Sequence, residues 1–236
     1  MLLSGLCVAI FAAFGTQTLL EHRARAIDYR PGDPVVRLYA ADLAGGAPDP
    51  TALVEAITRS GADIVVLQNV GPVDFDAIEA TLPALRYRVS AQQAASATGG
   101  GETLIASRYA LLGREEDQSA SSSTLRTLAR TPVGRIELIV LSAVGKPSGS
   151  PGVDRAPGVA AVAVAWQPGF AAASLRGQGM LPIADRGGLR LPGWRPDEAN
   201  AVWRSSELGV VAHRAAPPIG GLRPALIADL NLSRRR

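Results

Sequence analysis

Carboxylates are the side chains of this sequence that could hold a metal ion, because the other common ligands are scarce. The 236 residues include one cysteine and two histidines. These numbers exclude an internal disulfide, a cysteine-rich zinc or iron–sulfur site and a histidine-rich metal site. Metal chemistry would therefore need a hard cation such as Mg²⁺, held by carboxylate and amide oxygens. We predict no bound cofactor.

Four local features that could suggest chemistry have simpler interpretations. The acidic run Glu115–Asp117 is predicted to be a solvated loop, because consecutive carboxylates in an exposed turn point in different directions. Gly99–Gly101 lacks the Gly-Lys-Ser/Thr ending of a phosphate loop and precedes a predicted strand. His213 is expected on the surface at a strand end, and His22 at a membrane interface.

The elements that must position any site alternate between short apolar runs and amphipathic stretches. Asp49 and Gly61 are suited to cap a helix between them. The pattern indicates one mixed α/β domain. The predicted strands are Val35–Ala41, Asp63–Gln68, Tyr87–Val89, Thr103–Ser107, Ala110–Arg114, Ile136–Val144, Ala201–Ala212 and Pro224–Leu232. The predicted helices are Pro50–Ser60, Phe75–Leu82 and Val159–Trp166, and Gly145–Gly158 is predicted to be a loop.

The first 20 residues contain no charged side chain and just reach the length of a membrane-spanning helix. A cleaved signal peptide is the alternative, but the apolar run lacks a basic region before it and a small-residue site after it. We therefore predict a transmembrane anchor over 1–22, a linker over 23–34 and a folded domain over 35–236. Thr16, Gln17 and Thr18 would suit packing against other transmembrane helices.

The overall composition predicts a folded protein without a strong preference for polyanions. Apolar residues make up 47% and charged residues 19% of the chain, and 24 Lys and Arg face 21 Asp and Glu, a net charge of +3. Such a chain is far from the composition of disordered segments. The small positive charge makes nucleic acid an improbable partner.

Six strings follow one another along the chain at the ends and centres of the predicted strands. They are VRLYAADLAGG at 36–46, ADIVVLQNV at 62–70, GGETLIASRYAL at 100–111, IELIVLSAV at 136–144, NAVWRS at 200–205 and LRPALIADLNL at 222–232. Taken in order, they resemble the core motifs of the endonuclease/exonuclease/phosphatase family. The resemblance implies a four-layer α/β sandwich, with two mixed sheets face to face and helices outside. It also implies that active members cleave phosphoester bonds with Mg²⁺ or Mn²⁺.

Where the family keeps its chemistry, this sequence departs from the pattern. Asp42 stands at the position of a metal-site Asn, and a turn-capping role is favoured for it over a residual ligand. Asn69 replaces the main metal-ligand Glu, and Ala143 replaces a catalytic His. Asn200 occupies the position of the Asp that precedes the family's Trp-containing strand. The Gly-Asp-Phe-Asn motif is absent.

The closing Ser-Asp-His-Arg-Pro motif of the family reads Gly220-Gly221-Leu222-Arg223-Pro224 here. Gly221 therefore replaces the orienting Asp, and Leu222 replaces the general-base His. With no base and one credible carboxylate, the stabilisation that a metal gives the transition state has no source. The strands that carried the chemistry nevertheless persist.

The sequence therefore predicts a catalytically inactive, membrane-anchored protein of this fold, acting as an accessory or structural subunit of an integral membrane protein complex. The expected partners are the membrane protein complex and the lipid bilayer. The chain is expected to contact the complex through the anchor helix and through two loops, Gly145–Gly158 and Gly187–Pro196, the second of which contains Trp194. A divergent Mg²⁺-dependent phosphodiesterase or phosphatase is the alternative. A third interpretation is non-catalytic binding of a phosphorylated ligand in the old cleft.

The expected location is the bacterial inner membrane, with one span. Arg23, Arg25 and Arg30 favour a cytoplasmic domain by the positive-inside rule. The resemblance favours the opposite side, because relatives with an N-terminal span place this domain outside. We predict a periplasmic domain.

Overall fold

The computed structural model describes residues 30–43, 49–92, 101–119, 122–143, 155–156, 158–165, 168–183, 201–217, 219 and 224–232. Within these ranges it has two six-stranded sheets and three helices. The predicted anchor over 1–22 and most of the linker over 23–34 lie outside the described residues. No helix in the described ranges is long and apolar enough to cross a bilayer.

The first helix, α2 (Pro50–Ser60), begins and ends where its sequence predicts. Asp49 is the N-cap, and its carboxylate accepts a hydrogen bond of 2.9 Å from the backbone N–H of Thr51. Gly61 ends the helix in the left-handed conformation at φ 66°, which glycine adopts without steric cost. The buried residues Leu53 and Ile57 lie four positions apart and form the face that packs on the first sheet.

The first sheet has the order β11-β12-β1-β2-β4-β3. Only β1 and β2 run parallel, joined through α2, and the other neighbours are antiparallel. Its strands are β1 (Val36–Asp42), β2 (Ile64–Val70), β3 (Tyr87–Gln92), β4 (Glu102–Ser107), β11 (Leu208–Ala215) and β12 (Leu226–Leu232).

The second sheet repeats this arrangement in the order β5-β6-β7-β8-β10-β9. Its central pair, β7 and β8, is parallel, and the outer pairs are antiparallel. The two sheets therefore share one topology. The strands are β5 (Leu111–Gln118), β6 (Ser122–Thr131), β7 (Gly134–Ala143), β8 (Ala160–Ala165), β9 (Leu181–Pro182) and β10 (Ala201–Arg204).

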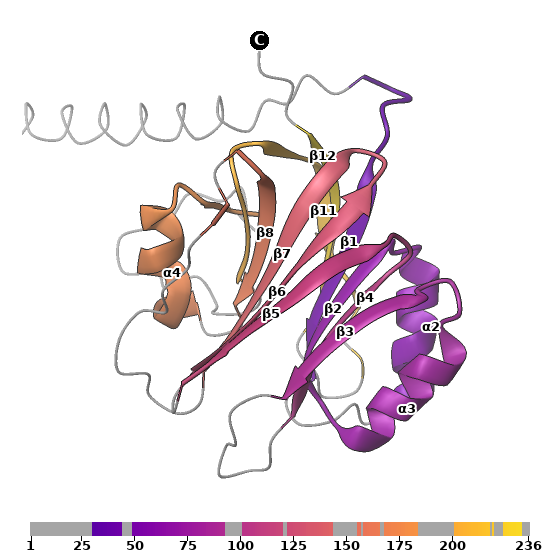
Figure 1. Ribbon diagram of the computed structural model, residues 1–236. Coiled ribbons are helices and arrows are strands. Elements are labelled where there is room, and N and C mark those ends of the chain that lie inside the picture. Colours follow the sequence, from indigo (N-terminus) through magenta and orange to yellow (C-terminus); the bar gives the residue numbers. More distant parts are fainter. Residues whose placement is uncertain are drawn as a thin grey trace, which may run out of the picture.

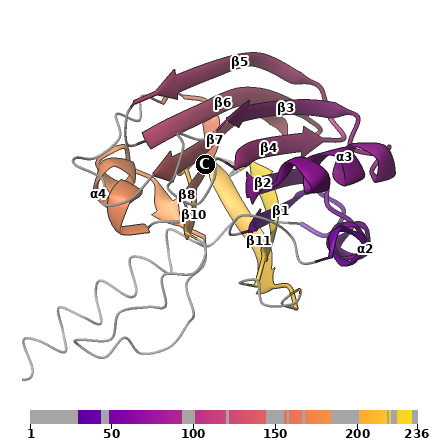
Figure 2. The same cartoon turned by 90° about the horizontal axis from the view of Figure 1, so that it is seen from below.

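Helices cover the outer faces of both sheets. In Figures 1 and 2, α2 and α3 (Pro72–Thr81) lie on one side of the molecule and α4 (Pro168–Gly177) on the other. One apolar cluster joins the facing sheets through residues such as Leu38 and Leu138. A second joins the first sheet to α2 and α3, and a third joins the second sheet to α4 through Leu175. The predicted four-layer sandwich is confirmed in these residues.

One predicted helix is wrong: most of Val159–Trp166 forms strand β8. All six residues of β8 are buried. Val162 and Val164 face the inter-sheet cluster, whereas Ala161 and Ala163 face α4. A strand buried on both faces shows no alternation of polar residues, so its alanine-rich sequence resembles that of a core helix.

Three other features differ from the sequence prediction. Glu115–Asp117 is exposed, as predicted, but belongs to β5 and not to a loop. Ala201–Ala212 is not one strand, because a turn after Arg204 separates β10 from β11. Strand β6 and helix α4 were not predicted.

Candidate functional site

The parallel strands of both sheets end at one side of the sandwich, which we call the site edge. Three predicted site residues, Asp42, Asn69 and Ala143, lie at the ends of β1, β2 and β7. The sheets meet here, because the Gln68 amide nitrogen of β2 donates hydrogen bonds to β7. The structure therefore brings these three positions to one edge.

Asn69 donates a hydrogen bond of 2.5 Å from its side-chain nitrogen to the carboxylate of Asp42. The backbone conformation directs the Asn69 side chain toward Asp42. The register of β2 against β4 shifts between Leu67 and Val70, and Asn69 has φ 57° in this bulge, the only positive value of a non-glycine residue in the described ranges. Asparagine tolerates this conformation better than most residues. The bulge thus turns the Asn69 amide toward Asp42.

Gly101 supports this bulge from the residue before β4. A Cβ atom at position 101 would lie 2.7 Å from the Cα and 3.0 Å from the carbonyl carbon of Asn69. Real Cβ atoms essentially never come so close to backbone, so the contact requires glycine. The close approach fixes the backbone that carries the Asn69 amide.

A buried polar cluster lies beside the Asp42–Asn69 pair and joins the two sheets. Gln68, only 2% exposed, donates from its amide nitrogen to the Leu141 carbonyl at 3.0 Å and to the Ser142 hydroxyl at 2.6 Å. The Thr103 hydroxyl lies 3.5 Å from that of Ser142. Hydrogen bonding inside a low-dielectric core makes such a cluster stabilising and specific. Its role is to hold the sheets together.

This cluster was not anticipated from the sequence. Gln68 closes the apolar run DIVVLQ, and Ser142 follows IELIVL. The sequence feature that could have indicated the cluster is a polar residue at the end of each apolar run. A polar group buried there needs a hydrogen-bond partner. The sequence does not reveal that these two groups are partners, since 73 residues separate Gln68 from Leu141.

Ala143 is half-buried at the end of β7, directly opposite Ser122 of β6. A methyl group neither accepts a proton nor binds a metal, so this position contributes no acid–base chemistry. The other predicted site residues, Asn200, Gly221 and Leu222, lie outside the described residues. The same holds for most of the predicted contact loops Gly145–Gly158 and Gly187–Pro196.

The described residues at the site edge do not form a ligand set for a hard divalent cation. Mg²⁺ prefers six oxygen ligands with carboxylates among them. The described part of the chain contains no group of three or more His, Cys, Asp or Glu side chains that could hold a metal. At the site edge the Asp42 carboxylate accepts a hydrogen bond from Asn69, so one of its oxygens is already directed at an amide N–H group.

The charge at these strand ends is also unsuited to phosphate. The ionisable side chains at the described ends of β1, β2, β4 and β7 are the half-buried carboxylates Asp42 and Glu102. Negative charge repels a phosphate unless a cation intervenes. A cavity of about 10 Å³ lies instead on the outer face of the first sheet, beside Tyr39 and Leu53, and has room for about one water molecule.

Solved structures similar to this chain include several endonuclease/exonuclease/phosphatase proteins. The endonuclease/exonuclease/phosphatase of Beutenbergia cavernae matches with a TM-score of 0.61 and 12% identity, over 84% of this chain and 72% of its own. The corresponding protein of Bacteroides vulgatus matches with a TM-score of 0.55 and 12% identity, over 85% of this chain and 100% of its own.

The human Nocturnin catalytic domain, solved with a bound sulfate, matches with a TM-score of 0.58 and 10% identity, over 85% of this chain and 95% of its own. No protein-family model matches the chain, and no curated protein matches it. The likeness therefore lies in the fold, and the relatives that share it include enzymes. The two sheets, their order and these neighbours show that this chain has the fold of the endonuclease/exonuclease/phosphatase family.

Proposed function

We propose that this chain is a non-catalytic member of its fold, anchored in a membrane and acting as an accessory subunit of a membrane protein complex. The observation that carries the loss of catalysis is the hydrogen bond from Asn69 to Asp42. The family resemblance assigns these two positions to the metal. Here an amide N–H group stands where a cation would neutralise the carboxylate.

Phosphoester cleavage needs a nucleophilic water, a base that takes its proton and positive charge on the phosphoryl oxygens. Ala143 supplies no base, and the nearby carboxylates supply the wrong charge. Gly221 and Leu222 have, by residue type alone, no proton-transfer chemistry. At the positions that the resemblance would assign to catalysis, no side chain therefore supplies the base or the positive charge.

The accessory role is supported by what the chain keeps. Two six-stranded sheets and three apolar clusters preserve a rigid surface for binding other proteins. The uncharged apolar segment at 1–20 supports membrane attachment. A rigid domain loses little conformational entropy when it binds, which favours a scaffold.

The test of catalysis is hydrolysis of a generic phosphodiester and a generic phosphomonoester by the purified full chain with Mg²⁺ or Mn²⁺. We expect the rate to equal that of buffer. Metal-dependent hydrolysis that is lost in Asp42→Ala, but kept in Asp117→Ala, would establish the divergent phosphoesterase instead. Asp117 is an exposed carboxylate of β5 and controls for a general loss of negative charge.

The test of the accessory role is purification from native membranes in mild detergent. The chain should be retained in the membrane fraction after alkaline carbonate and should co-purify with other integral proteins in fixed stoichiometry. Elution as a lone monomer from several detergents would contradict the accessory role. Release by carbonate would contradict the anchor.

A further inference from the structure

The first described strand begins, and the last one ends, at the side of the sandwich opposite the site edge. We call it the basal edge, where β1, β2, β7 and β8 begin. Residues 30–35 lead into β1 here, and β12 ends here, since Val36 pairs with Leu230. A Cβ atom on Gly134 of β7 would lie 2.7 Å from Leu232, so both sheets contribute to this edge. The described start of β1 and the end of β12 lie together in Figure 1.

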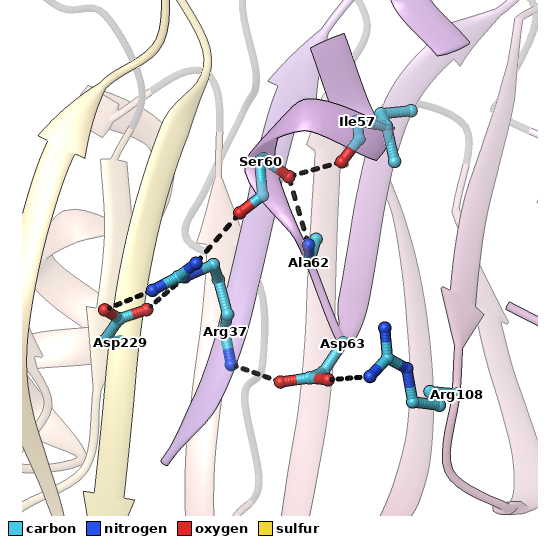
Figure 3. A network of polar contacts seen from close by, with 7 residues as sticks. All are labelled: Arg37, Ile57, Ser60, Ala62, Asp63, Arg108 and Asp229. Atoms are coloured by element: carbon cyan, nitrogen blue, oxygen red, sulfur yellow. Dashed lines mark hydrogen bonds and ion pairs between the residues drawn. The ribbon is translucent and has the colours of Figure 1, made fainter. Parts of the chain in front are cut away.

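The acidic groups of the basal edge are mostly bonded to cations inside the protein. Figure 3 shows that Arg37 binds both carboxylate oxygens of Asp229, at 2.6 and 2.9 Å. Asp63 accepts from the Arg37 backbone N–H at 3.0 Å and lies 3.3 Å from Arg108. These carboxylates are largely buried, with side-chain exposures of 14% and 13%. They contribute little to the charge that a partner meets.

The exposed charge of this edge is mostly arginine. Asp33, just before β1, is half-buried and accepts a hydrogen bond of 3.1 Å from the backbone N–H of Arg30. Glu55 of α2 is exposed and lies 3.3 Å from Arg59. Arg108 remains 52% exposed despite its contact with Asp63. The exposed arginines, which come from both sheets and from the segments beside them, are Arg30, Arg59, Arg86, Arg108, Arg130 and Arg135.

Two of these arginines face each other across the β6–β7 hairpin. Arg130 and Arg135 are directly opposite in the antiparallel register, and both are exposed. Side chains opposite each other in such a pair have Cβ atoms about 5 Å apart, and like charges there destabilise the sheet. No described carboxylate forms an ion pair with either. A pair of this kind is suited to an anion from outside the domain.

We propose that the basal edge docks on an anionic lipid surface, with the site edge facing away from the membrane. The choice of partner rests on the membrane attachment in the proposed function. The linker over 23–34 leads to this edge and spans at most roughly 40 Å when fully extended. Arg234–Arg236 follow β12 in sequence, and the turns of both sheets present their arginines on the same side. Basic residues held near an anionic bilayer bind it without a specific pocket.

The experiment places the full chain in nanodiscs of neutral lipid or of neutral lipid mixed with phosphatidylglycerol. In a Cys7→Ser background, a fluorophore is attached at Pro132→Cys, in the exposed turn between the two arginines, or at Asp117→Cys, near the site edge. Lipids with a nitroxide headgroup quench a fluorophore that touches the membrane. We expect quenching at 132 in anionic discs, little quenching at 117, and loss of the difference at high salt.

Matched variants separate charge from fold. Arg130→Gln and Arg135→Gln should each lower the ratio of docked to free domain roughly fivefold. Arg130→Lys with Arg135→Lys should keep it, and Arg214→Gln, an exposed arginine near the site edge, should not change it. Equal quenching at 132 and 117, or no dependence on lipid charge, would overturn the proposal.

The experiments distinguish failure of the proposed anchor from failure of the proposed docking by the basal edge. A chain that resists carbonate but shows no quenching at 132 keeps its anchor and lacks the docking edge. If carbonate releases the chain, flotation of the same full chain with anionic or neutral vesicles tests the edge alone. Stronger binding to duplex DNA than to anionic vesicles, weakened by Arg130→Gln and Arg135→Gln, would assign the edge to nucleic acid and overturn lipid docking.

Discussion

Asn69 differs from aspartate by one amino group in place of an oxygen, and that group determines what the Asp42 carboxylate binds. A donor at 2.5 Å gives the carboxylate a hydrogen-bond partner from within the protein. The bulge of β2 and the close approach of Gly101 hold this donor in place. At the residue scale, the site is a hydrogen-bonded pair whose geometry is built by the backbone.

Asn69→Asp should convert this pair into two facing carboxylates. Their repulsion destabilises the folded state when both are ionised, so stability should be lost at neutral pH and recovered in acid, where one of the two carboxylates takes up a proton. We expect the free energy of unfolding to fall by about 1–3 kcal/mol at pH 7. Millimolar Mg²⁺ should restore part of it, because a cation can bridge the two carboxylates.

The measurement is denaturant unfolding of the full chain with and without Mg²⁺ at several pH values. Asn69→Gly is the matched control, since it accepts the same backbone conformation and adds no charge. Its responses to Mg²⁺ and to pH should equal those of the wild-type protein. A wild-type protein that Mg²⁺ itself stabilises would contradict the interpretation of this site as one without a metal.

Gly101→Ala should disturb the same pair through the backbone. The new methyl group would lie 2.7 Å from the Cα of Asn69, so the bulge must move, which costs roughly 1–3 kcal/mol. Gly177→Ala is the control, because nothing lies within 4 Å of a Cβ atom there. Thermal unfolding should show a clear loss for Gly101→Ala and almost none for Gly177→Ala. Equal losses would mean that Gly101 is not specially required.

At the scale of elements, the sequence predicted those whose signals are local. Helix α2 has its N-cap, its amphipathic face and its final glycine within a few residues. Strand β7 is a long apolar run. Strand β8 was mistaken for a helix because its burial on both faces depends on α4 and on the first sheet, which its own residues do not reveal. The acidic end of β5 is a strand because β6 pairs with it, against its low strand propensity.

For the candidate site too, the sequence predicted the features with local signals and not those that depend on tertiary structure. The positions of Asp42, Asn69 and Ala143 at strand ends were predicted, because the apolar runs that precede them are local signals. Their mutual contacts were not predicted. The Asn69–Asp42 bond depends on a bulge, and the Gln68–Ser142 bond depends on the packing of two sheets, so both arise from tertiary structure.

A half-buried ion pair connects the turn after β10 to the segment before β8. Arg155 donates to Glu207 at 2.7 Å and to the Val159 carbonyl at 3.2 Å. Burial alone would raise the pKa of Glu207, but hydrogen bonds from Arg155 and Ser205 outweigh it and lower the pKa to about 2. The pair therefore stabilises the folded protein above the carboxyl's ordinary pKa of 4.5.

Acid should remove this stabilisation progressively as the pH falls from about 5 to about 2, because the unfolded state takes up the proton first. We expect a contribution of about 2 kcal/mol from this group. In Glu207→Gln, the difference in unfolding free energy between pH 6 and pH 3 should shrink by that amount. Glu55→Gln, which removes an exposed partner of Arg59, should leave the difference unchanged. An unchanged acid response in Glu207→Gln would contradict the role of this pair.

At the scale of the whole molecule, two sheets of identical topology face each other across one apolar cluster. The chain crosses between them at the basal edge, after β4 and after β10. Neither sheet can bury its inner face without the other. The parallel pairs β1–β2 and β7–β8 lie at the centre of each sheet, so their backbone amides should be the most protected from exchange with solvent.

Leu138→Ala tests whether the two sheets unfold as one unit. Leu138 of β7 is 2% exposed in the inter-sheet cluster, and its truncation should cost about 2–5 kcal/mol. Hydrogen exchange followed by mass spectrometry should show the slowest amides of β1 and β2 accelerating by the same factor as those of β7 and β8. Leu175→Ala, in the face of α4 that packs on the second sheet, should accelerate α4 more than β1. Acceleration confined to the second sheet in Leu138→Ala would mean that the sheets unfold separately, because a shared core must transmit the loss to both.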